Sequence, residues 1–205
     1  MSAFQEFPPP LRVLASASRF ATRVCGLAVV AMALLIAIDV VARKLFATTL
    51  MSGGVGEISG YVLAIITAWG AASALLARSH VRIDTLQIML PRSVGRVADV
   101  MAILAFVAAS AVLSYVAYLT FSRSFGLNAH SMTPLAVPLA IPQGLWFAGL
   151  VFLTLMSAAV ALAGCIALAK GDHTTAHRLI GPRSVEEEVD EQNAIIDSSL
   201  TNVKP

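Results

Sequence analysis

Long apolar stretches alternate with short polar segments along this chain of 205 residues. Four of the stretches reach the length of about 20 residues that a helix needs to cross the hydrocarbon core of a bilayer. They cover approximately residues 24–42, 58–77, 100–121 and 145–169. A segment surrounded by hydrocarbon must satisfy its own backbone hydrogen bonds, so each stretch is expected to be an α-helix. The pattern therefore predicts an all-α membrane protein with four transmembrane helices in a domain of residues 24–170.

The composition supports this fold class. Hydrophobic residues make up 58% of the chain and charged residues only 13%, whereas average soluble domains carry about 25% charged residues. The formal net charge of +2 is small and the basic residues are spread along the chain, which argues against a nucleic-acid partner. The composition therefore predicts a protein that lies in the lipid bilayer.

The distribution of Lys and Arg predicts the orientation. Most of them fall in the N-terminal segment, in the loop between the second and third spans, and in the C-terminal segment. The other two loops hold only Arg43, Lys44 and Arg123. Because positive charge is retained in the cytoplasm, both termini are expected to be cytoplasmic.

The polar segments at the two ends of the chain have different characters. Residues 1–23 carry arginines at relative positions i, i+7 and i+11, which share one face of a helix. This spacing predicts an N-terminal interfacial amphipathic helix, and an ordinary positive flank is the alternative. Residues 171–205 are polar, contain the run EEEVDE, and are expected to form a disordered acidic cytoplasmic tail. The three arginines of the N-terminal segment are Arg12, Arg19 and Arg23.

Small residues recur every four positions along the second span. This spacing lets a neighbouring helix approach closely, which matters in lipid because no hydrophobic drive brings helices together there. Trp69 lies in the middle of the same span and is expected to pack between helices. The recurring small residues are Gly56, Gly60, Ala64, Ala68 and Ala72.

The third loop carries three prolines at four-residue intervals, Pro134, Pro138 and Pro142. Each proline lacks the N–H that a helical hydrogen bond requires. The loop is therefore expected to be extended and to press against the outer face of the membrane.

Asp39 is the one ionisable residue inside the four predicted spans. It precedes Arg43 by four residues, in the acid-first order that favours an ion pair on one helix face. We therefore interpret it as half of a boundary ion pair. A proton relay is disfavoured because the other spans contain no acidic residue, and haem ligation is disfavoured because all four histidines lie outside the spans. No catalytic, cofactor or metal site is expected.

Four short motifs resemble a known family. They are DVVARKLF at residues 39–46, GEISGY at 56–61, HVRID at 80–84 and PLAIPQG at 138–144. In this order the motifs resemble the DctQ-like family, the small integral-membrane subunit of tripartite ATP-independent periplasmic (TRAP) transporters. HVRID is the most specific of them, and the resemblance extends over roughly residues 20–170.

The resemblance implies a permease subunit rather than an enzyme, located in the bacterial inner membrane. It would brace a large TRAP membrane subunit that imports an organic acid, typically a carboxylate, with an ion gradient. A periplasmic substrate-binding protein would deliver that acid. Structural or partner-contact roles then fall to His80, Arg82 and Asp84 at the cytoplasmic corner and to Arg43 and Glu57 at the periplasmic one, with Asp39, Gly60 and Trp69 as further candidates.

Three other interpretations remain open at this point. The first is the small subunit of a tripartite tricarboxylate transporter, which also has four helices. The second is a membrane anchor for a redox enzyme, and the third is a freestanding membrane scaffold.

Overall fold

The computed structural model of the chain describes residues 9–48, 54–77, 92–181, 189 and 193. The regular structure of this part of the chain is helical, and it contains no strand beyond one isolated bridge between His130 and Pro138. Four of its helices are long and apolar enough to cross a membrane, so the prediction of an all-α protein with four candidate spans is confirmed. The helices are α1 (Pro9–Phe46), α2 (Gly54–Leu76), α4 (Arg92–Gly126), α5 (Ala140–Ala169) and α6 (His173–Ile180).

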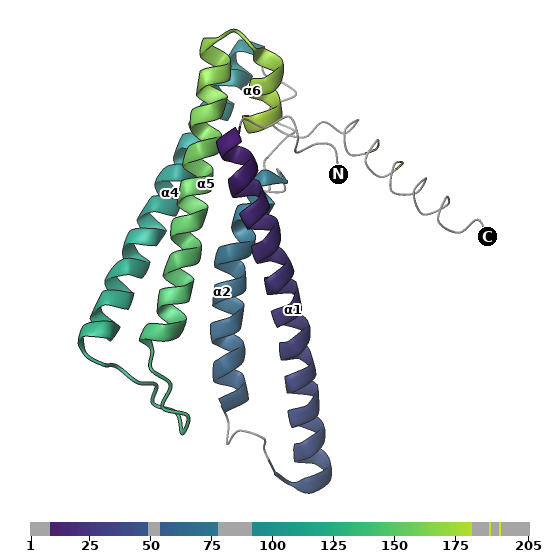
Figure 1. The fold of residues 1–205 in the computed structure, drawn as a ribbon, viewed down its shortest axis with the longest axis vertical. Helices are drawn as coiled ribbons and strands as arrows, with labels where there is room; N and C mark the ends of the chain where they lie inside the picture. The colour runs from purple at the N-terminus through teal and green to yellow at the C-terminus, as the bar shows by residue number, and fades with distance from the viewer. Residues whose placement is uncertain (1–8, 49–53, 78–91, 182–188, 190–192, 194–205) are drawn as a thin grey trace, which may run out of the picture.

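The long helices form two antiparallel pairs, α1 with α2 and α4 with α5 (Figure 1). Contacts between α2 and α5 join the pairs. The start of α1 lies at the same end of the molecule as α6, and we call this the α6 end. The opposite end, where α4 is connected to α5, is called the loop end; the two pairs spread apart towards it (Figure 1).

The helix α1 is much longer than one membrane crossing needs. Its 38 residues correspond to about 57 Å at 1.5 Å per residue, against a hydrocarbon core of about 30 Å. The helix continues without interruption past residue 23, so the expected boundary between an N-terminal helix and the first span is not a helix boundary. The interfacial position of Arg12, Arg19 and Arg23 stays a prediction.

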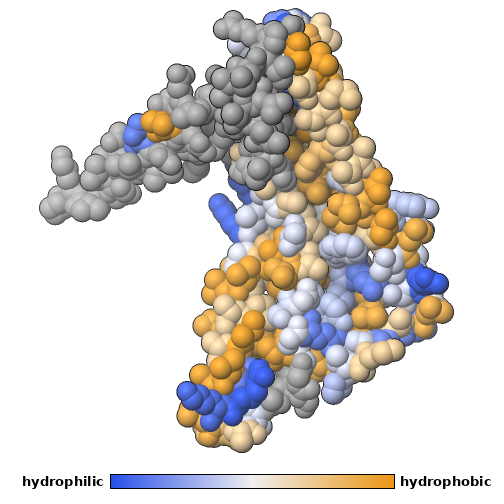
Figure 2. All heavy atoms as spheres, turned by 180° about the vertical axis from the view of Figure 1, so that it is seen from behind, coloured by the Kyte–Doolittle hydropathy of each residue, from blue (hydrophilic) through white to orange (hydrophobic). Residues whose placement is uncertain are grey.

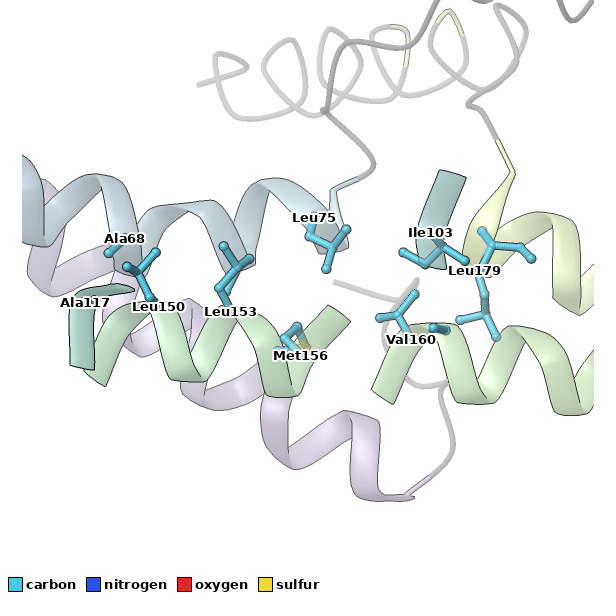
Figure 3. Packing of buried hydrophobic residues seen from close by; sticks show 12 residues of the cluster. Ala68, Leu75, Ile103, Ala117, Leu150, Leu153, Met156, Val160 and Leu179 are labelled. Atoms are coloured by element: carbon cyan, nitrogen blue, oxygen red, sulfur yellow. The ribbon is translucent and has the colours of Figure 1, made fainter. Parts of the chain in front are cut away.

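The core lies along α5, which is the most buried of the four candidate spans. Leu150, Leu153, Met156 and Val160 of α5 meet side chains from the neighbouring helices (Figure 3). These partners are Ala68, Ala72 and Leu75 of α2, Ile103 and Ala117 of α4, and Leu179 and Ile180 of α6. Much of the remaining surface is apolar, and hydrophilic residues lie at the loop end of α1 (Figure 2).

Part of the predicted disordered tail is ordered. Residues 173–180 form α6, so the prediction of disorder is wrong for this segment. Gly171, with a φ of 76°, lets the chain reverse after α5, and Asp172 caps α6 by accepting from the Thr175 amide. Ala176 and Ile180 share one face and are buried, because this face packs on α5. The acidic run at 186–191 lies outside the described residues, except for Val189.

The loop between α4 and α5 is folded more tightly than expected. The Ser131 amide donates to the Val137 carbonyl and the Leu139 amide to the Ala129 carbonyl, each at 2.9 Å, so the loop is hairpin-like rather than extended. Pro142 belongs to α5. A proline in the first turn of a helix costs no hydrogen bond, because the N–H groups there have no helical partner.

Candidate functional site

The ion pair between Asp39 and Arg43 is present near the loop end of α1. The Asp39 side chain is only 2% exposed, whereas the Arg43 side chain is 53% exposed. Burial of a carboxylate is costly unless it is paired and hydrogen-bonded. The Arg43 side chain is largely exposed and supplies the compensating charge, so the buried carboxylate is paired within α1.

Hydroxyl groups join α1 to α2 near the α6 end. The Ser18 and Ser73 hydroxyls lie 2.7 Å apart, and the Thr22 hydroxyl contacts that of Ser73 while also donating to the Ser18 carbonyl at 3.0 Å. Ser18 is fully buried. Such contacts between helices replace bonds that lipid cannot provide.

A second set of hydroxyl contacts joins α4 to α5. The Ser110 and Ser157 hydroxyls lie 3.2 Å apart, and those of Ser114 and Thr154 lie 2.9 Å apart. These residues were missed in the sequence. Their signal was the spacing of Ser110 and Ser114 at i, i+4 and of Thr154 and Ser157 at i, i+3, which places each pair on one helix face.

Trp69 lies between α2 and α5, as expected from the sequence. Its indole stacks on Phe152 with ring centroids 5.5 Å apart, and its Nε1–H donates to the Leu145 carbonyl at 3.0 Å. A Cβ placed on Gly149 would lie 2.7 Å from Cδ1 of this indole. Gly149, which the sequence analysis missed, is therefore the position that lets the ring reach the backbone of α5.

The small residues of α2 do not all serve one contact. Ala68 and Ala72 are buried in the core, whereas Gly56, Gly60 and Ala64 are exposed in the described structure. A Cβ on Gly60 would have nothing within 4 Å. Because a helix has 3.6 residues per turn, residues spaced by four shift gradually around its surface. The row therefore begins on an exposed face at Gly56 and reaches the contact with α5 at Ala68 and Ala72.

Glu57 connects α2 to the loop between α4 and α5. Its carboxylate accepts a hydrogen bond from the Thr133 hydroxyl and one from the Tyr61 hydroxyl at 2.5 Å. A Cβ on Gly54 would lie 2.1 Å from Cδ1 of Leu135, so the loop packs directly on the first turn of α2. Glu57 and its neighbours thus connect the first turns of α2 to the loop between α4 and α5.

The residues of HVRID, with His80, Arg82 and Asp84, lie outside the described residues. Close to the α6 end, Arg96 of α4 contacts the imidazole of His173, with Nη1 3.2 Å from Nδ1. Asp99, one turn further along α4, is buried. This end of α4 is therefore polar and is partly covered by α6.

The polar groups described above serve to pack helices and to fix their ends. Within the described residues no three His, Cys, Asp or Glu side chains come together as a metal site would require. Both cysteines, Cys25 and Cys165, are free thiols. The buried contacts of the described residues are concentrated along α5.

Comparison with known proteins identifies the family. The family model for the DctQ component of tripartite ATP-independent periplasmic transporters matches residues 32–174. No curated protein and no solved structure matches the chain. The match runs from within α1 to the start of α6 and includes all four of the short motifs. Three of these motifs lie in the described residues, and HVRID lies outside them. The chain therefore belongs to the DctQ family, whose members are the small permease subunits of TRAP transporters.

Proposed function

We propose that this small permease subunit braces the large TRAP membrane subunit during uptake of an organic acid across the bacterial inner membrane. The observation that carries the proposal is the family match, which covers three of the candidate spans completely and the first from residue 32 onward. The contacts within the chain agree with a bracing role, because the hydroxyl groups of Ser18, Ser110 and Ser114 each contact a hydroxyl group on a neighbouring helix. Wide apolar faces are left on the outside of the described helices.

The substrate is proposed to be a carboxylate that a periplasmic binding protein delivers. The large subunit would move it inward, coupled to an ion gradient. This division of roles leaves substrate choice to the other two components. The family is one of transporter subunits rather than enzymes, so we assign the chain no reaction of its own.

Both termini are proposed to face the cytoplasm. The excess of Lys and Arg in the terminal segments and the second loop supports this orientation. The start of α1 and α6 lie at the same end of the molecule, as an even number of crossings requires. In a chain with Cys25 and Cys165 replaced by alanine, a membrane-impermeant maleimide should label Met132→Cys in intact spheroplasts. Thr174→Cys should be labelled only after the membrane is opened, and the reverse pattern would overturn the orientation.

Reconstituted uptake tests the bracing role. Proteoliposomes would contain the large subunit with or without this chain, and would receive purified binding protein loaded with a labelled carboxylate. We expect uptake under a sodium or proton gradient only when both membrane subunits are present. Full uptake by the large subunit alone would contradict the proposal.

A further inference from the structure

Hydroxyl contacts fix the relative heights of the helices within each pair. The hydroxyl oxygens of Ser18 on α1 and Ser73 on α2 lie 2.7 Å apart. Those of Ser114 on α4 and Thr154 on α5 lie 2.9 Å apart. Each contact therefore marks a height at which the two helices of one pair are level with each other.

The contact between Trp69 and Gly149 fixes the height of one pair relative to the other. These residues lie against each other where α2 and α5 pack together, and both helices run towards the α6 end (Figure 1). Ser73 follows Trp69 by four residues and Thr154 follows Gly149 by five, so Ser73 and Thr154 lie at nearly the same height. The four hydroxyl residues thus share one height, which we call the hydroxyl level.

The charge-free stretches of the four helices are centred at different distances from this level. They are residues 24–38 of α1, 58–76 of α2, 140–169 of α5 and 100–122 of α4. At 1.5 Å per residue, the α1 stretch is centred about 20 Å from the hydroxyl level towards the loop end, and the α2 stretch about 9 Å. The α5 stretch is centred on the level, and the α4 stretch about 5 Å beyond it towards the α6 end. The centres therefore shift steadily in the order in which the helices contact one another.

A bilayer perpendicular to the helices does not fit all four stretches. Centred on α4 and α5, it would place Arg23 of α1 in hydrocarbon, where a charge is costly, and would leave the exposed side chains of Leu34 and Ile38 in water. Centred on α1, it would leave the exposed side chains of Met101 and Val112 of α4 in water. Either position conflicts with the apolar surface of one helix pair.

An oblique bilayer removes both conflicts. We infer that the lipid-contacting surface of the described helices is an oblique band, displaced towards the loop end on α1 and towards the α6 end on α4. The exposed residues Arg23 and Lys170 then mark one membrane surface, although they lie about 30 Å apart along the bundle. Arg43 and Arg123 mark the other surface, about 24 Å apart in the same direction. The two boundaries are displaced in the same sense, as the two surfaces of one inclined layer must be.

The thickness of the band selects a lipid bilayer as its occupant. Along α1 the band measures about 30 Å from Arg23 to Arg43, and along α4 about 36 Å from Asp99 to Arg123. The hydrocarbon core of a bilayer is about 30 Å thick, and a helix that crosses it obliquely needs a longer stretch. The band follows from the four spans and their contacts, so it depends neither on the bracing role nor on which end faces the cytoplasm.

Spin labels at equal heights on different helices test the oblique band. The full chain, with Cys25 and Cys165 replaced by alanine, would be reconstituted in lipid nanodiscs. The ratio of label collisions with a water-soluble nickel chelate to those with oxygen reports the depth of each label. Close to the hydroxyl level, we expect this ratio to be at least threefold higher for Phe20→Cys on α1 than for Tyr115→Cys on α4. A perpendicular bilayer would give the two labels the same ratio.

A second pair of labels, nearer the loop end, should show the opposite order. Phe125→Cys on α4 should have a higher ratio than Leu27→Cys on α1, because α4 has left the band at this height and α1 has entered it. Leu155→Cys on α5 is the matched control and should have the same ratio as Tyr115→Cys. All five native side chains are exposed in the chain. Equal ratios within either pair, or a higher ratio for the same helix in both pairs, would overturn the oblique band.

Lysine substitutions give a reading in native membranes that does not depend on a label. Leu27→Lys and Tyr115→Lys place a charge inside the band and should lower the amount of chain in the membrane severalfold, because charge is costly there. Phe20→Lys and Phe125→Lys place it at the edges of the band, where a lysine reaches the headgroups, and should leave this amount nearly unchanged. Equal losses for Phe20→Lys and Tyr115→Lys would contradict the inference.

Discussion

The indole of Trp69 rests on the backbone of α5 at Gly149. A Cβ at Gly149 would lie 2.7 Å from Cδ1 and 2.9 Å from Nε1 of the ring, and the ring nitrogen donates to the Leu145 carbonyl one turn earlier. Ala68 is also close, with its Cβ 2.9 Å from the same position. The close approach of the Trp69 indole to α5 thus depends on the absence of a side chain at Gly149.

Gly149→Ala should therefore destabilise the protein. Overpacking of a filled contact typically costs about 1–3 kcal/mol, which here exceeds the gain of up to about 1 kcal/mol from the better helix propensity of alanine. Gly70→Ala is the matched control, because a Cβ at Gly70 has nothing within 4 Å. Thermal unfolding in detergent should show a lower Tm for Gly149→Ala and an unchanged or higher Tm for Gly70→Ala. Equal Tm values for the two variants would show that α2 and α5 can move apart at Gly149 without loss of stability.

Ser114 and Thr154 should be energetically coupled. Their hydroxyls lie 2.9 Å apart on α4 and α5, and double-mutant cycles within membrane helices give about 0.6 kcal/mol on average for such contacts. A cycle of Ser114→Ala and Thr154→Val, read from unfolding in a mixed detergent series, should yield a coupling of this size. Thr120→Val serves as the control partner because its hydroxyl donates to Val116 of its own helix. Coupling of Ser114 to Thr120 as large as that to Thr154 would argue against a specific interhelical contact.

Arg43→Gln should cost more stability than Lys44→Gln. Arg43 compensates the buried carboxylate of Asp39, and withdrawal of a partner from a buried polar group costs about 1–3 kcal/mol. Lys44 occupies the same last turn of α1 and is exposed, so both variants lose the same favourable interaction with the helix dipole. Comparison of the two Tm values isolates the ion pair. A larger loss for Lys44→Gln would mean that Arg43 is not the charge that Asp39 needs.

The cap of α6 should titrate in the acid range. Hydrogen bonds from Thr175 and Thr174 lower the pKa of Asp172 from its usual 3.8 to about 2. Because the folded-state pKa is the lower one, ionised Asp172 stabilises α6 at pH values above about 4, and this contribution is lost as the pH falls towards 2. Hydrogen exchange of the α6 amides, corrected for intrinsic rates, should show protection decreasing over this interval.

Two substitutions separate the charge of this cap from its geometry. Asp172→Asn keeps an acceptor oxygen for the Thr175 amide, so it should retain most of the protection at neutral pH and lose its acid dependence. Asp172→Ala should lose protection at every pH, because alanine is a poor N-cap residue. An acid dependence that persists in Asp172→Asn would assign the titration to another group.

Apolar pattern predicted the larger features of the fold. The spans are long and nearly free of charge, so the number of apolar residues needed to cross a bilayer is enough to identify four of them. The spacing of Asp39 and Arg43 predicted their pairing because both lie on a single helix, whose geometry is known in advance. Trp69 was placed between helices because its depth excluded the interface.

Contacts between helices were less predictable. The row from Gly56 to Ala72 indicated close packing, but only the crossing angle of α2 and α5 decides which members are buried. Gly149 stands alone in an apolar run and acquires its role from an indole on another helix. The helix α6 was overlooked because eight residues in a polar tail form a helix only when their apolar face finds a surface, here α5.

Co-purification from native membranes tests the central claim most directly. The chain would be tagged at its C-terminus, extracted in a mild detergent, and its partners identified by mass spectrometry and quantified. The account predicts that a large polytopic TRAP membrane subunit accompanies it in a fixed ratio. Isolation of the chain alone, stable and folded, would contradict the bracing role and favour a freestanding scaffold.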